Sequence, residues 1–259
     1  MKIAIVSDLH LDFQNVNKYT FLNEENAEIL LIAGDTCESR NLDKFKNTFK
    51  NICEKYKDVF IIAGNHEFYK NFHADSLDQL YEFSRKFNNM HFLNNDCINL
   101  SENYILIGST LWTDFNKGNP LAMNTAKDVM NDYKLIKIIK TGYRKLAPKD
   151  TFEFHIRSKE FIESELNNNK NKKVILFTHH APSFLSLQNN SKPSYDDYCF
   201  ASDLSNLILD NSHIKYWIHG HTHFSANYTI GNCNVISNPR GYPHENYVDN
   251  FKPLVIEIS

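Results

Sequence analysis

Six short apolar runs that stop abruptly at polar residues are the feature that most constrains the fold of this chain. Each is rich in Ile, Val or aromatic residues and has three to five members. They are Ile3–Val6, Ile29–Ala33, Val59–Ala63, Tyr104–Ile107, Val174–Phe177 and Tyr216–Ile218. Because the runs lack an alternating polar face, they predict strands that are buried on both faces of a sheet.

Segments with helical spacing separate the first strands. Apolar side chains recur at helical intervals over residues 45–56 and again over residues 77–87. Alternating strands and helices predict parallel pairing with right-handed crossovers. Nearer the C-terminus, Asn227–Ile230, Val235–Ser237 and Leu254–Ile258 look like strands without long helices between them. We therefore expect an α/β fold in which two sheets pack face to face with helices outside.

We expect a single domain over residues 1–259 with one irregular insertion at about residues 110–151. Gly118, Pro120, Gly142 and Pro148 interrupt a weak helical pattern there. A connection this long is commonly functional or mobile. Trp112 and Tyr133 in the insertion are candidates for contacting a leaving group, with packing onto the domain as the equal alternative.

The charge and cysteine content exclude several classes of protein. The 28 Lys and Arg against 31 Asp and Glu give a net charge of −3, which argues against a dedicated binder of nucleic acid or acidic membranes. The five cysteines are scattered and form no CxxC pair, so they suggest neither a disulfide framework nor a thiolate zinc site. The N-terminal apolar run is too short for a signal peptide, and no apolar stretch approaches membrane-spanning length. The simplest expectation is a cytoplasmic protein.

Polar clusters follow five of the predicted strands, at their ends or just beyond. They are Asp8-Leu9-His10, Gly34-Asp35, Gly64-Asn65-His66-Glu67, Thr178-His179-His180 and His219-Gly220-His221-Thr222-His223. The carboxyl ends of strands in an α/β sheet share one edge, and ligands bind at that edge. The sequence therefore predicts one site assembled from all five clusters.

Each cluster is weaker evidence alone than in combination. An Asp-x-His sequence is common by chance, and Gly-Asp is typical of a turn. The His-x-His spacing of His221 and His223 is more specific, because it puts both rings on the same side of an extended backbone. Together the clusters supply only oxygen and nitrogen donors, which indicates a metal site.

The charge of such a site indicates its chemistry. Two divalent ions would bring four positive charges; Asp8 and Asp35 neutralise two and a bridging hydroxide one, so about one positive charge remains. That centre attracts an anionic phosphate ester and stabilises charge developing in the transition state.

The ordered motifs resemble the signature of the calcineurin-like metallophosphoesterases from residue 8 to residue 223. The resemblance implies a four-layer αββα sandwich of two mixed sheets, with two metals at one sheet edge. It implies a first metal bound by Asp8, His10, Asp35 and His223. It implies a second metal bound by Asp35, Asn65, His179 and His221. Asp35 would bridge the two, and His66 would assist the leaving group.

One departure separates the chain from the protein serine/threonine phosphatase branch of that superfamily. The branch carries Gly-Asp-x-Val-Asp-Arg-Gly, whereas this chain reads Gly34-Asp35-Thr36-Cys37-Glu38-Ser39-Arg40. The aspartate expected to orient the catalytic histidine is absent, and Glu38 is a candidate to replace it.

Two further residues are weaker candidates for binding substrate. His180 follows a predicted ligand, and its alternative role is to form a hydrogen bond behind that ligand. Arg240 lies in the Pro/Gly turn after a strand and could hold a phosphate, although a turn arginine at the surface is commoner.

These observations predict a binuclear metal-dependent hydrolase of phosphomonoesters or phosphodiesters. A metal-bridging hydroxide would attack phosphorus, Asn65 and the metals would hold the phosphoryl oxygens, and His66 would protonate the leaving oxygen. The ligands suit Mn, Fe, Zn, Co or Ni, and the partner would be a small-molecule or nucleotide phosphoester. One alternative is a nuclease of the same superfamily, which the charge of −3 disfavours. Another is a metal-binding scaffold without catalysis. The oligomeric state stays open.

Overall fold

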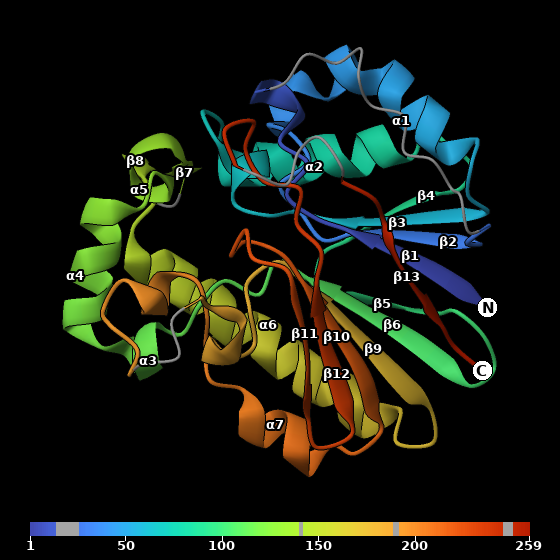
Figure 1. The fold of residues 1–259 in the computed structure, drawn as a ribbon. Helices are drawn as coiled ribbons and strands as arrows, with labels where there is room; N and C mark the ends of the chain where they lie inside the picture. Colours follow the sequence, from blue (N-terminus) through green and yellow to red (C-terminus); the bar gives the residue numbers. More distant parts are fainter. Residues whose placement is uncertain (14–25, 140–141, 189–191, 246–250) are drawn as a thin grey trace.

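The computed structural model describes residues 1–13, 26–139, 142–188, 192–245 and 251–259, and it consists of two mixed sheets packed face to face (Figure 1). The first sheet has the strand order β13 (Leu254–Glu257), β1 (Lys2–Val6), β2 (Ile29–Ile32), β3 (Asp58–Ile62) and β4 (Met90–Leu93). Its strands run parallel except β13, which pairs antiparallel with β1.

The second sheet has six strands. Their order is β11 (Ala226–Ile230), β12 (Cys233–Ser237), β10 (Ile214–His219), β9 (Lys173–Thr178), β6 (Tyr104–Ser109) and β5 (Asp96–Asn99). The four central strands are parallel, and an antiparallel strand closes each edge. The sequence predicted this sheet as more antiparallel than it is.

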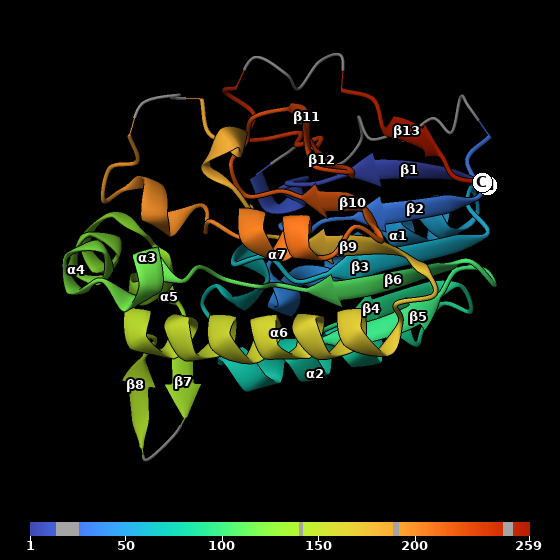
Figure 2. The same cartoon turned by 90° about the horizontal axis from the view of Figure 1, so that it is seen from below.

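Helices cover the outer face of each sheet, so the four-layer αββα prediction is confirmed. Figures 1 and 2 show α1 (Lys46–Cys53) and α2 (His73–Ser84) over the first sheet, and α6 (Pro148–Asn168) and α7 (Ser205–Asp210) over the second. Short 3₁₀ helices lie in the connections: Leu11–Phe13, Ser39–Phe45, His66–Phe68, Phe184–Ser186 and Asp197–Cys199. Among the described residues, no helix is both long and apolar enough to cross a membrane.

Both faces of the central strands are buried, as the unbroken apolar runs predict. In β1, Ile3 and Ile5 point into the core between the sheets, whereas Ala4 and Val6 pack under the helices of the first sheet. Phe177 and Ile218 of the second sheet contribute to the same central core. Burying apolar surface on two sides holds these strands in register, because a one-residue shift would exchange the two faces.

The insertion forms a small helical unit at one side of the sandwich. It contains α3 (Phe115–Gly118), α4 (Pro120–Val129), α5 (Asp132–Leu135) and the hairpin of β7 (Lys137–Ile139) and β8 (Tyr143–Lys145), and α6 begins at its end. Trp112 and Tyr133 are 3% and 8% exposed and belong to the hydrophobic core. For these two aromatics the structure therefore favours the packing alternative.

Gly108 of β6 allows the two sheets to pack tightly, which generates a prediction about stability. A Cβ at this position would lie 2.5 Å from Leu93 Cβ in β4 and 3.3 Å from Ile62 Cγ2 in β3. Gly108→Ala should lower the free energy of unfolding by about 1–3 kcal/mol, the usual effect of overpacking. Urea unfolding measures this. Combined with Leu93→Gly, which removes the Cβ that the new methyl meets, the loss should fall short of the sum of the single losses; strict additivity would contradict the proposed contact.

Candidate metal centre

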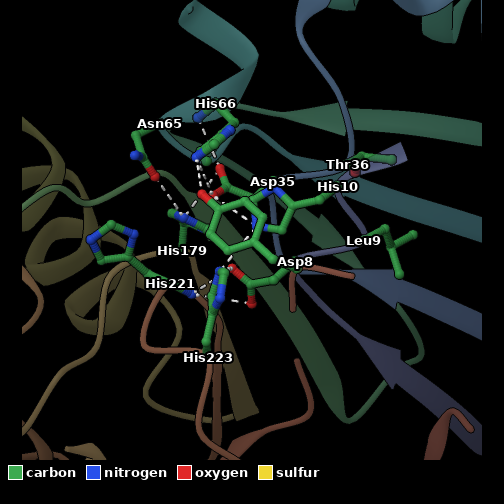
Figure 3. A network of polar contacts seen from close by, with 12 residues as sticks. Asp8, Leu9, His10, Asp35, Thr36, Asn65, His66, His179, His221 and His223 are labelled. Atoms are coloured by element: carbon green, nitrogen blue, oxygen red, sulfur yellow. Dashed lines mark hydrogen bonds and ion pairs between the residues drawn. The ribbon is translucent and has the colours of Figure 1, made fainter. Parts of the chain in front are cut away.

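The predicted ligands meet at the edge where both sheets present the carboxyl ends of their parallel strands. The loops after β1, β2 and β3 belong to the first sheet, and those after β9 and β10 to the second. Figure 3 shows the side chains gathered around Asp35: Asp8, His10, Asn65, His66, His179, His221 and His223. All except the partly exposed His223 are buried.

Left-handed backbone orients most of these ligands. Five of them have φ between +45° and +69°: Asp8, His10, Asp35, His221 and His223. Only a few per cent of non-glycine residues adopt such angles. Each instance costs about 1–3 kcal/mol and persists only where the surrounding structure enforces it. Because these left-handed residues are candidate metal ligands, the strained backbone lowers the stability of the fold while it orients the donor atoms.

Glu67 and Gly64 bring the loops after β2 and β3 into contact. The buried Glu67 carboxylate accepts hydrogen bonds from the backbone N–H groups of Thr36 at 2.6 Å, Gly64 at 2.7 Å and Asp35 at 3.0 Å. Burial, followed by the nearby charge of Asp35, raises the pKa of Glu67 to about 8. A Cβ on Gly64 would lie 2.1 Å from Asp35 Oδ1, so only glycine fits. The motif glycine and glutamate therefore fix the position of Asp35.

The first group of donors coincides with the first metal site implied by the sequence. One donor atom from each member lies within 4.8 Å of the others; the members are Asp8, His10, Asp35 and His223. The Nε2 atoms of His10 and His223 are 3.0 Å apart, and His223 Nε2 is 3.5 Å from Asp8 Oδ1. Two atoms each about 2.1 Å from one ion are separated by about 3.0–3.4 Å. The spacing fits a shared ion.

The second group consists of Asp35, His179 and His221, again within 4.8 Å. His179 Nε2 lies 3.3 Å from Asp35 Oδ1 and 3.1 Å from Asn65 Oδ1, so Asn65 joins this group. The buried Nε2 of His221 has no hydrogen-bond partner within the described part of the chain. A buried polar atom left unpaired is costly, and a metal ion would satisfy it. The donors present therefore fit two ions, with Asp35 common to both.

The shifted pKa values of the donor side chains favour the binding of cations. Burial raises the pKa of Asp35, but the surrounding imidazoles, led by His179, outweigh it and hold that pKa well below its ordinary value. Burial lowers the pKa of His179, yet Asp35 outweighs this and raises it to about 10. Burial holds the pKa of His10 and His221 well below the ordinary value, so both rings stay neutral near pH 7 with a lone pair to donate. A bound metal would displace the proton of His179.

His66 lies beside the donor groups without belonging to either. Its Nε2 is 3.9 Å from Asp35 Oδ2 and 2.9 Å from Tyr242 Oη, which is its hydrogen-bond partner. Glu38 instead binds Arg40 and Lys70 at 2.6 and 2.7 Å. The hypothesis that Glu38 orients His66 is therefore wrong for this structure, because the two cations hold the carboxylate elsewhere.

Sequence reasoning missed two residues of the C-terminal loop that support the site. Tyr242 stacks on His10 with ring centroids 4.3 Å apart in addition to binding His66. Glu245 accepts a hydrogen bond from His223 Nδ1 at 2.9 Å, a contact that fixes the ring orientation of a metal ligand. Neither follows a predicted strand directly, so strand-end position gave no signal for them.

His180 and Arg240 lie near the site but away from its open space. His180 is buried behind His221, with ring centroids 4.1 Å apart, and its Nδ1 lies 3.2 Å from the Thr110 carbonyl oxygen. This contact favours its alternative role behind a ligand. Arg240 is buried and donates to the carbonyl oxygen of Leu9. Neither lines the cavity, and phosphate binding by Arg240 stays a prediction.

A cavity of about 310 Å³ opens over the donor groups. Asp35, Asn65, His66, His221 and His223 form its floor. Apolar and aromatic side chains form much of its wall: Tyr69, Val129, Met130, Phe200, Phe224 and Tyr242. Val129 is the last residue of α4 in the insertion and Met130 follows it directly, so the insertion borders this space.

Comparisons with known proteins agree with this geometry. The sequence profile described as calcineurin-like phosphoesterase matches residues 1–225. The uncharacterized protein L509 of Acanthamoeba polyphaga mimivirus is 31% identical, over 97% of this chain and 94% of its own length.

Solved structures share the fold at low sequence identity. The phosphopantetheinyl hydrolase of Mycobacterium tuberculosis has a TM-score of 0.75 at 14% identity and covers 98% of this chain and 95% of its own. A dimetal phosphatase from Danio rerio has a TM-score of 0.57 at 12% identity, with coverage of 91% and 86%. At such identities the likeness extends to the fold alone.

The shared position of Asp35 predicts unequal effects of two substitutions on metal content. After loading with Mn²⁺ and dialysis, the native chain should hold two ions, one for each donor group. Asp35→Asn should lose both, because the second donor group loses its only carboxylate and the first keeps Asp8 alone, whereas Asn65→Ala should lose mainly one. Elemental analysis measures the content, with Asp58→Asn in β3 as a control that should retain both. Two ions retained by Asp35→Asn would contradict the shared ligand.

Proposed function

Because the chain belongs to the calcineurin-like phosphoesterase family, we propose that it hydrolyses a phosphate ester with two divalent metal ions. The observation that carries this proposal is the pair of buried donor groups that share Asp35. When bound, the ions would activate a water molecule and neutralise charge that develops on the phosphoryl group. The geometry is compatible with Mn, Fe, Zn, Co or Ni, and cellular availability decides among them.

We assign the ligands by donor group. The first ion is held by Asp8, His10, Asp35 and His223, and the second by Asp35, Asn65, His179 and His221. Glu245 orients His223 from behind, and Glu67 holds the backbone of Asp35. The Asn65 side chain lines the cavity, but its Nδ2 donates to Asp132 and Tyr69, so we assign Asn65 to the metal rather than to a phosphoryl oxygen.

We assign proton transfer to His66. It lines the cavity and completes neither donor group, so its imidazole is left to serve the substrate. Tyr242 holds Nε2 through the 2.9 Å hydrogen bond. In that position His66 protonates the leaving oxygen as its bond to phosphorus breaks.

The cavity wall supports a substrate whose leaving group carries an apolar portion. Met130, Phe200 and Phe224 line the space next to the ligands, and apolar walls bind apolar groups by excluding water. We propose that the insertion caps the site through Val129 and Met130. A phosphopantetheinyl ester, the substrate class in the name of one structurally similar hydrolase, belongs in the test panel. All five cysteines are free thiols, which supports a reducing compartment such as the cytoplasm.

The role of His66 predicts a loss of turnover that depends on the leaving group. His66→Ala should keep its metal content and lose about 10²- to 10⁴-fold in kcat on alkyl phosphates, the usual contribution of a positioned acid. The loss should shrink for p-nitrophenyl phosphate, whose leaving group needs little protonation. His91→Ala, on β4 beside Asp58, is the control and should retain full activity. Equal losses on both substrates would exclude the acid role.

The cavity wall predicts a change in substrate preference when it is made polar. Met130→Ser should lower the ratio of kcat/KM for long-chain alkyl phosphates to that for methyl phosphate by about tenfold, or roughly 1.4 kcal/mol. Steady-state kinetics on monoester and diester series measure the ratio. Leu121→Ser alters an exposed leucine of α4, the helix that precedes Met130, and should leave the ratio unchanged. An unchanged ratio in Met130→Ser would place selection elsewhere.

A further inference from the structure

Asp132 is a buried carboxylate of the insertion that contacts a metal ligand. It is the first residue of α5 and is only 2% exposed. Its Oδ1 accepts hydrogen bonds from Asn65 Nδ2 at 2.8 Å and from Tyr69 Oη at 2.8 Å. Asn65 Nδ2 and Tyr69 Oη are themselves 3.1 Å apart, so the three groups form a closed network.

This network determines which end of the Asn65 amide faces the metal centre. An amide has a hydrogen-bond donor on one side and an acceptor on the other, and an ionised carboxylate only accepts. With Nδ2 bound to Asp132, Oδ1 points toward His179 Nε2 at 3.1 Å, as Figure 3 shows. A flipped amide would present its NH₂ group to the metal and set two oxygens against each other at Asp132.

Asp132 itself stands outside both donor groups and does not line the cavity, so its effect must pass through Asn65. The two residues that precede it, Met130 and Asn131, do line the cavity. The cavity wall and the support of a metal ligand are therefore adjacent in the chain. This ties the position of the insertion to the second donor group.

We propose that Asp132, together with Tyr69, is a positioning residue that holds Asn65 in the orientation required by the second metal ion. The inference rests on the proposed function only for its catalytic consequence. Its direct consequence is selective metal affinity: loss of the Asp132 acceptor weakens the ion held by Asn65 and leaves the ion held by His10 and His223 nearly unchanged. Removing such a supporting contact typically weakens metal affinity about 10- to 100-fold.

The test is a calorimetric titration of the metal-free full chain with Mn²⁺ alone. Asp132→Ala should weaken one of the two binding steps by about 10- to 100-fold and the other by less than about threefold. Asp132→Asn keeps an oxygen that accepts both hydrogen bonds, so it should restore near-native affinity. Asp128→Ala, at an exposed aspartate of α4, is the matched control and should bind both ions normally.

Two further variants separate positioning from general destabilisation. In an Asn65→Ala background, Asp132→Ala should cause no additional loss of affinity, because the group it positions is gone.

Tyr69→Phe removes one of the two hydrogen bonds to Asp132 and should weaken the same binding step by a smaller factor. If Asp132→Ala does not fold, the Tyr69→Phe variant tests the proposal in its place. Equal weakening of both steps, additive losses with Asn65→Ala, or native affinity in Asp132→Ala and Tyr69→Phe would overturn the proposal. The titration contains no phosphoester, so it measures metal affinity independently of turnover. If the chain hydrolysed no phosphoester, the proposed function would be rejected, but the role of Asp132 in metal binding would stand.

Discussion

The buried carboxylate of Asp35 is the interaction on which the rest of the site depends. It is 2% exposed and takes part in both donor groups. Burying a charge costs several kcal/mol unless partners compensate it. The backbone N–H of His66 donates to Oδ1, and the imidazoles of His179 and His10 lie within 4 Å of its oxygens. These contacts orient the carboxylate, and divalent ions would supply the remaining compensation.

The sandwich can hold such a centre because the strained backbone lies in the loops that carry the ligands, whereas buried strands and hydrogen-bonding carboxylates hold those loops in place. Left-handed backbone at five ligands would relax if the loops were free, but strands buried on both faces anchor each loop at its start. Hydrogen bonds then fix the loops from behind: Glu67 binds three backbone N–H groups, Glu245 binds His223, and Asp132 binds Asn65. Rigid strands and supporting carboxylates together keep the donors in position before any ion arrives.

The sequence predicted the parts of this structure that local pattern determines. Unbroken apolar runs identified six strands, and polar clusters after five of them identified the donors that meet around Asp35. The strands β4 and β5 were not predicted, because His91, Asp96 and Asn99 interrupt their apolar pattern. Tyr242, Glu245 and Asp132 were missed because their role comes only from tertiary contact: Asp132 meets Asn65 across 67 residues of sequence. The local pattern left a pocket role and a packing role equally open for Trp112, and only the tertiary structure shows its burial in the core.

Anomalous diffraction from crystals of the chain loaded with Mn²⁺ is the measurement that tests the central claim most directly. Two peaks should appear on either side of the Asp35 carboxylate, separated by about 3.5–4 Å, as in two-metal sites generally. One peak should adjoin His10 and His223, and the other His179, His221 and Asn65. A single peak, or two peaks that Asp35 does not bridge, would contradict the account of a binuclear centre built on one shared carboxylate.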